Sequence, residues 1–255
     1  MAVNEGYVNI NKESNGIGTI EFYHPQSNSL PSHLLNKLAL TISEAGKDDE
    51  INVIILKSGG DRTFCAGASF DELKSISNDE EGLLFFSGFA NVINAARKCP
   101  KLIIGRVHGK AVGGGVGMAS AVDYCFANKY ASVKLSELAI GIGPFVVGPA
   151  VERKMGLSAM STLAINATKW FDSNWANQNG LFAEIFESTE LMDNHINELS
   201  LNIAQSHRKA TSELKRILWQ GTENWDELLI ERAKISGRLI LAAFSKNAIQ
   251  AIQKK

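Results

Sequence analysis

The sequence predicts an α/β fold followed by a mostly helical C-terminal part. Short apolar runs such as 53–56 (VIIL) and 102–104 (LII) alternate with segments whose apolar residues recur at helical spacing. Strands that alternate with helices imply parallel pairing through crossover connections. From about Val146 onward the pattern is mostly helical. We therefore expect an α/β core over residues 1–195 and a helical region over residues 196–255 that serves in oligomerisation.

Local signals justify each element of the first half. Asn15-Gly16 is a favoured hairpin turn between two β-prone runs. Pro31-Ser32 is a typical helix start, and an apolar face at helical spacing follows it. The continuous apolar runs indicate strands that are buried on both faces. The predicted order is strand 7–10, strand 17–22, a helix from 31, strand 53–56, a helix from about 70, helix 80–98, strand 102–104, helix 114–121 and strand 123–127.

Composition excludes several classes of function. The chain has 255 residues, 45% of them hydrophobic, which is enough for one large core. Its formal net charge of −1 gives no basic field that would attract nucleic acid or an anionic membrane. No apolar run is long enough to span a bilayer, and the first residues lack the pattern of a secretory signal. We expect neither a nucleic-acid partner nor a membrane partner.

The cysteines and histidines predict neither disulfides nor a metal site. Cys65, Cys99 and Cys125 are odd in number and form no C-x-x-C pair. The five histidines show no spacing typical of metal ligands. A reducing, cytoplasmic compartment is the simplest expectation.

Two segments rich in small residues lie where a strand gives way to a helix. The first is 64–70 (FCAGASF) and the second is 113–117 (GGGVG). Small residues let backbone N–H groups approach a ligand closely, and two such junctions can converge on one oxygen as an oxyanion hole. We expect the donors to be the amides of Ala68 and Gly114. Taken alone, the first segment is equally typical of a tight turn before a helix.

The glycine-rich segment does not match the common phosphate-binding patterns. A P-loop needs Ser or Thr after its Gly-Lys pair, whereas Ala111 follows Gly109-Lys110 here. No G-x-G-x-x-G opens the first strand–helix–strand unit, so a dinucleotide site is not indicated either.

Glu137 is a candidate acid/base. It stands between apolar neighbours ahead of a loop rich in glycine and proline. Apolar surroundings raise the pKa of a carboxyl group, as proton transfer near neutrality requires. On the residues alone, Glu137 is one candidate among 27 acidic residues, most of which are expected to be solvated or salt-bridged.

Four segments carry a family resemblance. They are 24–30 (HPQSNSL), 64–69 (FCAGAS), 113–117 (GGGVG) and 136–141 (SELAIG). They resemble, in the same order, the patterns R-P-x-x-x-N-A-L, F-C-A-G-A-D, G-G-G-x-E and P-E-x-x-x-G of the enoyl-CoA hydratase/isomerase family, also called the crotonase superfamily. The resemblance covers residue 7 to about residue 155. It implies a crotonase-like (ClpP/crotonase) fold, with a repeated ββα spiral core and a helical C-terminal region.

The resemblance also assigns roles. It implies that Ala68 and Gly114 donate the oxyanion-hole N–H groups and that Glu137 moves the proton. The residues that it implies for binding the substrate and its coenzyme A are Ala66, Ala68, Ser69, Phe70, Asp71, Gly114 and Gly117. Two-glutamate hydratases carry their other glutamate at the position of Gly117, and we expect this glycine to leave room for a branched acyl chain.

Several reactions agree with this resemblance. Hydration of an enoyl-CoA is the first expectation, because 136–149 resembles the corresponding segment of methylglutaconyl-CoA hydratases. A Δ3,Δ2-enoyl-CoA isomerase is the alternative, since such members also keep only the later glutamate. A decarboxylase or hydrolase of the same fold, or a protein that binds acyl-CoA without turnover, remains open.

The resemblance further implies an acyl-CoA thioester as the partner. Coenzyme A then enters as part of the substrate, so no separate cofactor is expected. A homotrimer or a dimer of trimers is the implied assembly.

Overall fold

A six-stranded sheet forms the centre of the molecule. The computed structural model describes residues 5–253, and its main sheet has the order β1-β2-β4-β7-β9-β12. β1 runs antiparallel to β2, and every other neighbouring pair is parallel. The strands are β1 (Tyr7–Lys12), β2 (Ile17–Tyr23), β4 (Val53–Ser58), β7 (Leu102–Val107), β9 (Tyr124–Asn128) and β12 (Glu184–Phe186).

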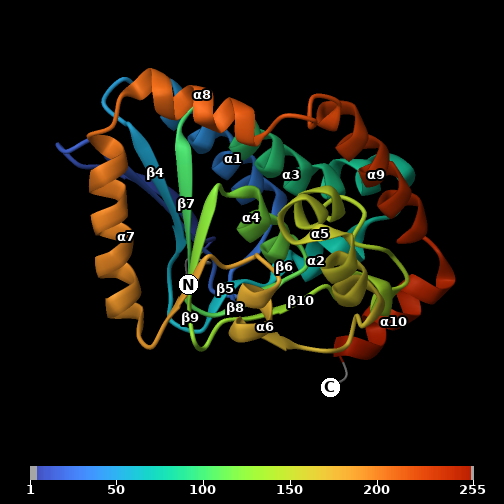
Figure 1. Cartoon of the computed structure of the whole chain (residues 1–255). Coiled ribbons are helices and arrows are strands. Elements are labelled where there is room, and N and C mark those ends of the chain that lie inside the picture. Colours follow the sequence, from blue (N-terminus) through green and yellow to red (C-terminus); the bar gives the residue numbers. More distant parts are fainter. Residues whose placement is uncertain (1–4, 254–255) are drawn as a thin grey trace.

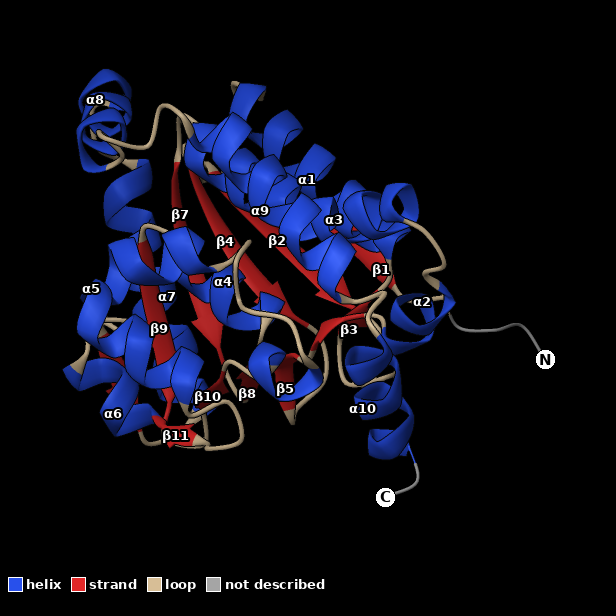
Figure 2. Cartoon of the chain, turned by 90° about the vertical axis from the view of Figure 1, so that its right-hand side faces the viewer, coloured by secondary structure: helices blue, strands red, loops and turns tan. Residues whose placement is uncertain are grey.

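Helices cover both faces of this sheet. α1 (Ser32–Lys47) and α3 (Asp79–Lys98) lie on one face, whereas α7 (Thr189–Ala204) lies on the other, as Figures 1 and 2 show. α9 (Trp225–Leu239) packs on α3. Along β4 the residues alternate between the two cores: Ile54 faces α1 and α3, and Ile55 faces α7. Burial on both faces explains why this strand is apolar without alternation.

Short strands form two smaller sheets beside the main one. The first has the order β11-β10-β8-β5, and the second pairs β3 with β6. Their bounds are β3 (Ser29–Leu30), β5 (Thr63–Cys65), β6 (Gly67–Ala68), β8 (Lys110–Val112), β10 (Ser132–Lys134) and β11 (Phe171–Asp172). None of these was predicted, because two or three residues carry no readable period. They matter because β6, β8 and β10 each lead into a segment of the predicted site.

The remaining helices complete the chain. They are α2 (Phe70–Ser75), α4 (Gly114–Ala121), the 3-10 turn η1 (Glu137–Ile140), α5 (Gly148–Ile165), α6 (Ser173–Gln178), α8 (Arg208–Leu218) and α10 (Ala243–Gln253). The predicted strands and helices of the first half are confirmed. The expected mostly helical part is interrupted only by β11 and β12 within the described residues.

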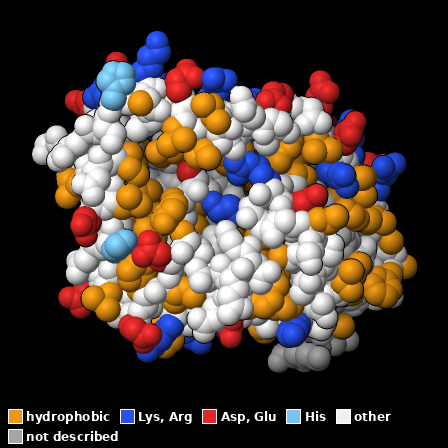
Figure 3. Space-filling view, viewed as in Figure 1, with side chains coloured by type: hydrophobic (Ala, Val, Ile, Leu, Met, Phe, Trp, Pro, Cys, Tyr) orange, Lys and Arg blue, Asp and Glu red, His pale blue; other side chains and the backbone are white. Residues whose placement is uncertain are grey.

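The expected division after residue 195 falls inside α7. This helix packs along β4, β7 and β9, so it belongs structurally to the α/β core. Hydrophobic side chains gather among charged ones on the face that Figure 3 shows. Across the molecule, Leu157 and Ile165 of α5 and Ile217 of α8 are more than half exposed. A role of the helical region in oligomerisation stays a prediction.

Residues 5–253 contain neither a helix that could span a membrane nor a cluster of potential metal ligands. In this range no helix combines the length and apolarity needed to cross a membrane. Likewise, its His, Cys, Asp and Glu side chains do not gather three at a time where they could hold a metal ion.

Candidate active site

The three glycines before and within α4 are each in close contact with a different part of the molecule. A β-carbon on Gly113 would lie 2.9 Å from Oε1 of Glu137, and the φ of +52° at Gly113 also favours glycine. A β-carbon on Gly114 would lie 2.2 Å from Cζ of Phe89. A β-carbon on Gly115 would lie 2.4 Å from the carbonyl oxygen of Cys65. Side chains at these positions would therefore push the site apart.

The first turn of α4 provides free amide donors. The first N–H groups of a helix have no intrahelical acceptor, and the helix dipole makes this end partly positive. The carbonyl of Gly113 accepts from Val116 and Gly117, and the Gly113 amide donates to Lys134 at 2.9 Å. The Gly114 amide therefore begins the helix beside Glu137, in a position suited to an anionic oxygen.

The strand pair β3–β6 fixes the other predicted donor. Ser69 N donates to Leu30 O at 2.9 Å, and Ser29 Oγ donates to the carbonyl of Ala68 at 2.8 Å. A β-carbon on Gly67 would lie 3.8 Å from the Gly114 amide nitrogen. The segment that carries Ala68 is thus held against the start of α4, and the two predicted donors lie in one place.

Glu137 is half-buried as a residue, but its carboxylate oxygen Oε2 is shielded from solvent and lacks a hydrogen bond. Glu137 begins η1, which follows β10, and its Oε2 finds no hydrogen-bond partner among the described residues. Burial raises the pKa of Glu137 to about 7, against the opposing effect of backbone hydrogen bonds from Ser136 and Glu137 itself. A carboxyl group with this pKa exchanges a proton readily at neutral pH.

These groups border one cavity of about 100 Å³. Glu137, Ala68 and Gly114 all line it, together with Ala66 and Phe70. Its other walls come from several elements and include Phe85, Phe86 and Phe89 of α3, Phe145, Val146 and Val147 before α5, and Ser236 of α9. The sequence reasoning missed these wall residues. For the phenylalanines, the only signal in the sequence was that they lie on the apolar face of a predicted helix. Nothing in the sequence indicated that Ser236 lies near the site.

A close contact between two helices brings Ser236 to the cavity. A β-carbon on Gly82 of α3 would lie 2.7 Å from the Cα of Gly237 in α9. The two helix axes can approach this closely only because both residues lack side chains. Ser236 is consequently 1% exposed and borders the cavity from a distant part of the chain.

Three residues expected to bind substrate lie outside this cavity: Ser69, Asp71 and Gly117. Ser69 is buried, and its hydroxyl accepts from Glu72 N at the start of α2, so it caps that helix. Asp71 is exposed and forms an ion pair with Lys74. The structure does not place any of the three among the cavity walls.

Gly117 does not provide the expected room for a branched acyl chain. A β-carbon there would lie 2.5 Å from Cγ1 of Val147, so this valine already fills the space. Val147 lines the cavity and Gly117 does not. The expectation is corrected: the absent glutamate leaves no pocket, because a residue before α5 has taken its place.

The fit between Gly117 and Val147 predicts a coupled effect on stability. Gly117→Ala should lower the free energy of unfolding by about 1–3 kcal/mol, because the added methyl group overpacks against Val147. Val147→Ala in the same chain should restore part of this loss. Urea unfolding measures both effects, and Val146→Ala is the control for the second change. Equal stability of Gly117→Ala and the unchanged protein would contradict the described packing.

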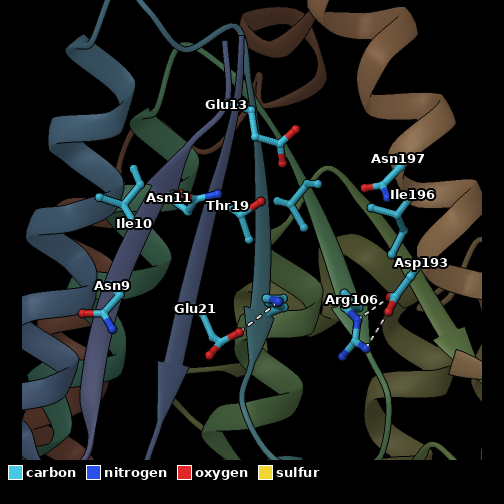
Figure 4. Close-up of a pocket in the computed structure, with 12 residues that line it drawn as sticks. Asn9, Ile10, Asn11, Glu13, Thr19, Glu21, Arg106, Asp193, Ile196 and Asn197 are labelled. Atoms are coloured by element: carbon cyan, nitrogen blue, oxygen red, sulfur yellow. Dashed lines mark hydrogen bonds and ion pairs between the residues drawn. The ribbon is translucent and has the colours of Figure 1, made fainter. Parts of the chain in front are cut away.

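A larger hollow of about 390 Å³ lies on the face of the main sheet that bears α7 (Figure 4). Its charged walls are largely paired: Arg106 donates twice to Asp193, at 2.5 and 2.9 Å, and Lys57 contacts Glu21 at 2.9 Å. Paired charges on an open sheet face offer no reactive group. We therefore take the cavity of Glu137 as the candidate active site.

His108 also belongs to this ionic network and does not line the cavity of Glu137. Its Nδ1 lies 3.1 Å from Nη1 of Arg106, and it is 3% exposed. Burial and the nearby guanidinium lower the pKa of His108 to about 4, so it is neutral at physiological pH. His108 therefore has a structural role beside Arg106.

Comparison with known proteins gives the family. The model of the enoyl-CoA hydratase/isomerase family matches residues 12–252, and the chain therefore belongs to this family of enzymes. An enoyl-CoA hydratase from Bacillus halodurans has the same fold, with a TM-score of 0.88 and 22% identity over 96% of this chain and 99% of that one. The crotonase-like fold expected from the sequence is confirmed.

Individual relatives differ in their reactions. A peroxisomal Delta(3,5)-Delta(2,4)-dienoyl-CoA isomerase of Arabidopsis thaliana is 29% identical over 76% of both chains. A short-chain-enoyl-CoA hydratase of Clostridium acetobutylicum is 27% identical over 89% of this chain and 87% of its own length. Human mitochondrial methylglutaconyl-CoA hydratase is 29% identical over 76% of this chain, which spans about half (54%) of that relative.

Proposed function

We propose that the chain hydrates a 2-enoyl-CoA thioester, with Glu137 as its acid/base. The observation that supports this most is the Glu137 carboxyl group, whose Oε2 has no hydrogen-bond partner among the described residues and which lines the same cavity as Gly114. Coenzyme A is part of the substrate, and no further cofactor takes part. The hydratases among the relatives supply the class of reaction.

Each step uses groups already described. The ionised Glu137 takes a proton from water as the water oxygen bonds to C3 of the enoyl group. The electron pair of the double bond moves onto the thioester, and the amides of Ala68 and Gly114 stabilise the enolate oxygen. Glu137 then returns its proton to C2. One water is added, and the enzyme regains its starting state.

Isomerisation is the second candidate, and one observation favours it. Glu137 is the only titratable side chain among the described residues that line the cavity, and Val147 occupies the space beside Gly117. A single carboxylate can take a proton from C2 of a 3-enoyl thioester and return it to C4 without water. The enolate would use the same two amides.

Product analysis separates these reactions. The protein is incubated with 2-enoyl-, 3-enoyl- and methylglutaconyl-CoA, and the products are identified by mass spectrometry. We expect a 2-enoyl-CoA to gain one water. Conversion of a 3-enoyl to a 2-enoyl thioester at unchanged mass would instead establish the isomerase. Binding without any turnover would overturn the proposed function.

A further inference from the structure

The side chains that line the cavity are mostly apolar. Apolar side chains from α3, from the segment before α5, and at Leu73, Ile140 and Ile142 all line it. The only polar side chains among the described lining residues are Glu137 and two serines, Ser136 and Ser236. Lysine, arginine and histidine are absent from this lining.

These walls disfavour an acyl group that carries its own charge. Moving a carboxylate out of water is strongly unfavourable unless a cation or several hydrogen-bond donors receive it. The acyl carboxylate would also share an apolar cavity with Glu137, whose ionised form it would repel. An uncharged acyl group meets neither penalty and gains from burial against the aromatic rings.

The cavity also restricts length. The ring of Phe89 lies against Gly114, and Val147 fills the space beside Gly117. The cavity volume of about 100 Å³ is small, so the space between these side chains suits a short acyl chain.

We propose that the substrate is a short, uncharged enoyl thioester, and that a dicarboxylic acyl group is excluded. This inference rests on the proposed function, because that function defines the enoyl thioester as the reacting group. Phe89 and Val147 limit the length of the chain, and the missing cation excludes the second carboxylate.

A matched pair of thioesters tests the charge. 2-Pentenoyl-CoA and glutaconyl-CoA have the same carbon skeleton, and they differ in a terminal methyl against a terminal carboxylate. We expect kcat/KM for 2-pentenoyl-CoA to exceed that for glutaconyl-CoA by on the order of 100-fold, because the desolvation of the second carboxylate weakens binding by at least this factor. Equal values, or a preference for glutaconyl-CoA, would overturn the inference.

Binding of saturated analogues separates this inference from the proposed function. Dissociation constants are measured by calorimetry for pentanoyl-CoA and glutaryl-CoA, which differ in the same way and cannot be hydrated. If pentanoyl-CoA binds on the order of 100-fold more tightly than glutaryl-CoA, the inference is supported, whether or not the enoyl thioesters are turned over. A lack of turnover would count against the proposed function and not against this inference. Equal binding would contradict the inference.

Discussion

Glu137→Gln is expected to lower kcat by a factor on the order of 10²–10⁴, which is the contribution of a positioned acid/base. The amide has nearly the shape of the carboxyl group but cannot take a proton from the substrate or from water. Because the amides of Ala68 and Gly114 remain in place, binding of a saturated acyl-CoA should change little. Steady-state kinetics and calorimetry measure the two quantities on the same preparation.

The control for this prediction is Glu231→Gln on α9. That side chain is exposed, so its replacement should leave both kcat and binding unchanged. Thermal unfolding shows whether Glu137→Gln is folded. A folded Glu137→Gln protein with full activity would assign the proton transfer to another group.

Asp123→Ala is expected to cost about 3–5 kcal/mol of unfolding free energy, because it leaves a buried lysine without its counter-charge. Oδ2 of Asp123 accepts from Lys215 Nζ and from Ile103 N, each at 2.7 Å, and Oδ1 accepts from Trp219 Nε1 at 2.7 Å. The side chains of Asp123 and Lys215 are 5% and 3% exposed. This network fastens α8 to the end of β7, and chemical denaturation measures its loss.

Two further variants make the test of Asp123 specific. Glu187→Ala removes an ion pair with Lys129 in which both side chains are exposed, and it should cost no more than about 1 kcal/mol. Adding Lys215→Met to Asp123→Ala should recover much of the stability, because no unpaired charge then stays buried. If the Asp123→Ala protein is nearly as stable as the unchanged protein, the network does not stabilise the packing of α8.

The sequence predicted the long elements because their periods are readable. The apolar run of β4 and the helical face of α3 are both present within a few residues of their predicted bounds. The short strands around the site were missed, since pairing with distant strands defines them. Ser29 and Leu30, for example, form a strand only because Gly67 and Ala68 lie beside them.

The candidate site shows the same division. The small residues at Gly113 and Gly114 were readable as points of close approach, and the structure shows what approaches: Glu137 and Phe89. The role of Val147 could not be read, because its contact with Gly117 depends on how the loop before α5 packs on α4. The local sequence indicates the positions at which the backbone must lack a side chain. Which residues pack against those positions depends on the tertiary structure.

The pH dependence of kcat/KM tests the central claim most directly. Glu137 must be ionised to accept a proton, and its pKa in the free protein is raised to about 7. For a 2-enoyl-CoA substrate, kcat/KM should therefore be constant at high pH and fall tenfold per pH unit below pH 7. A profile that stays flat down to pH 5 would contradict the assignment of Glu137 as the base.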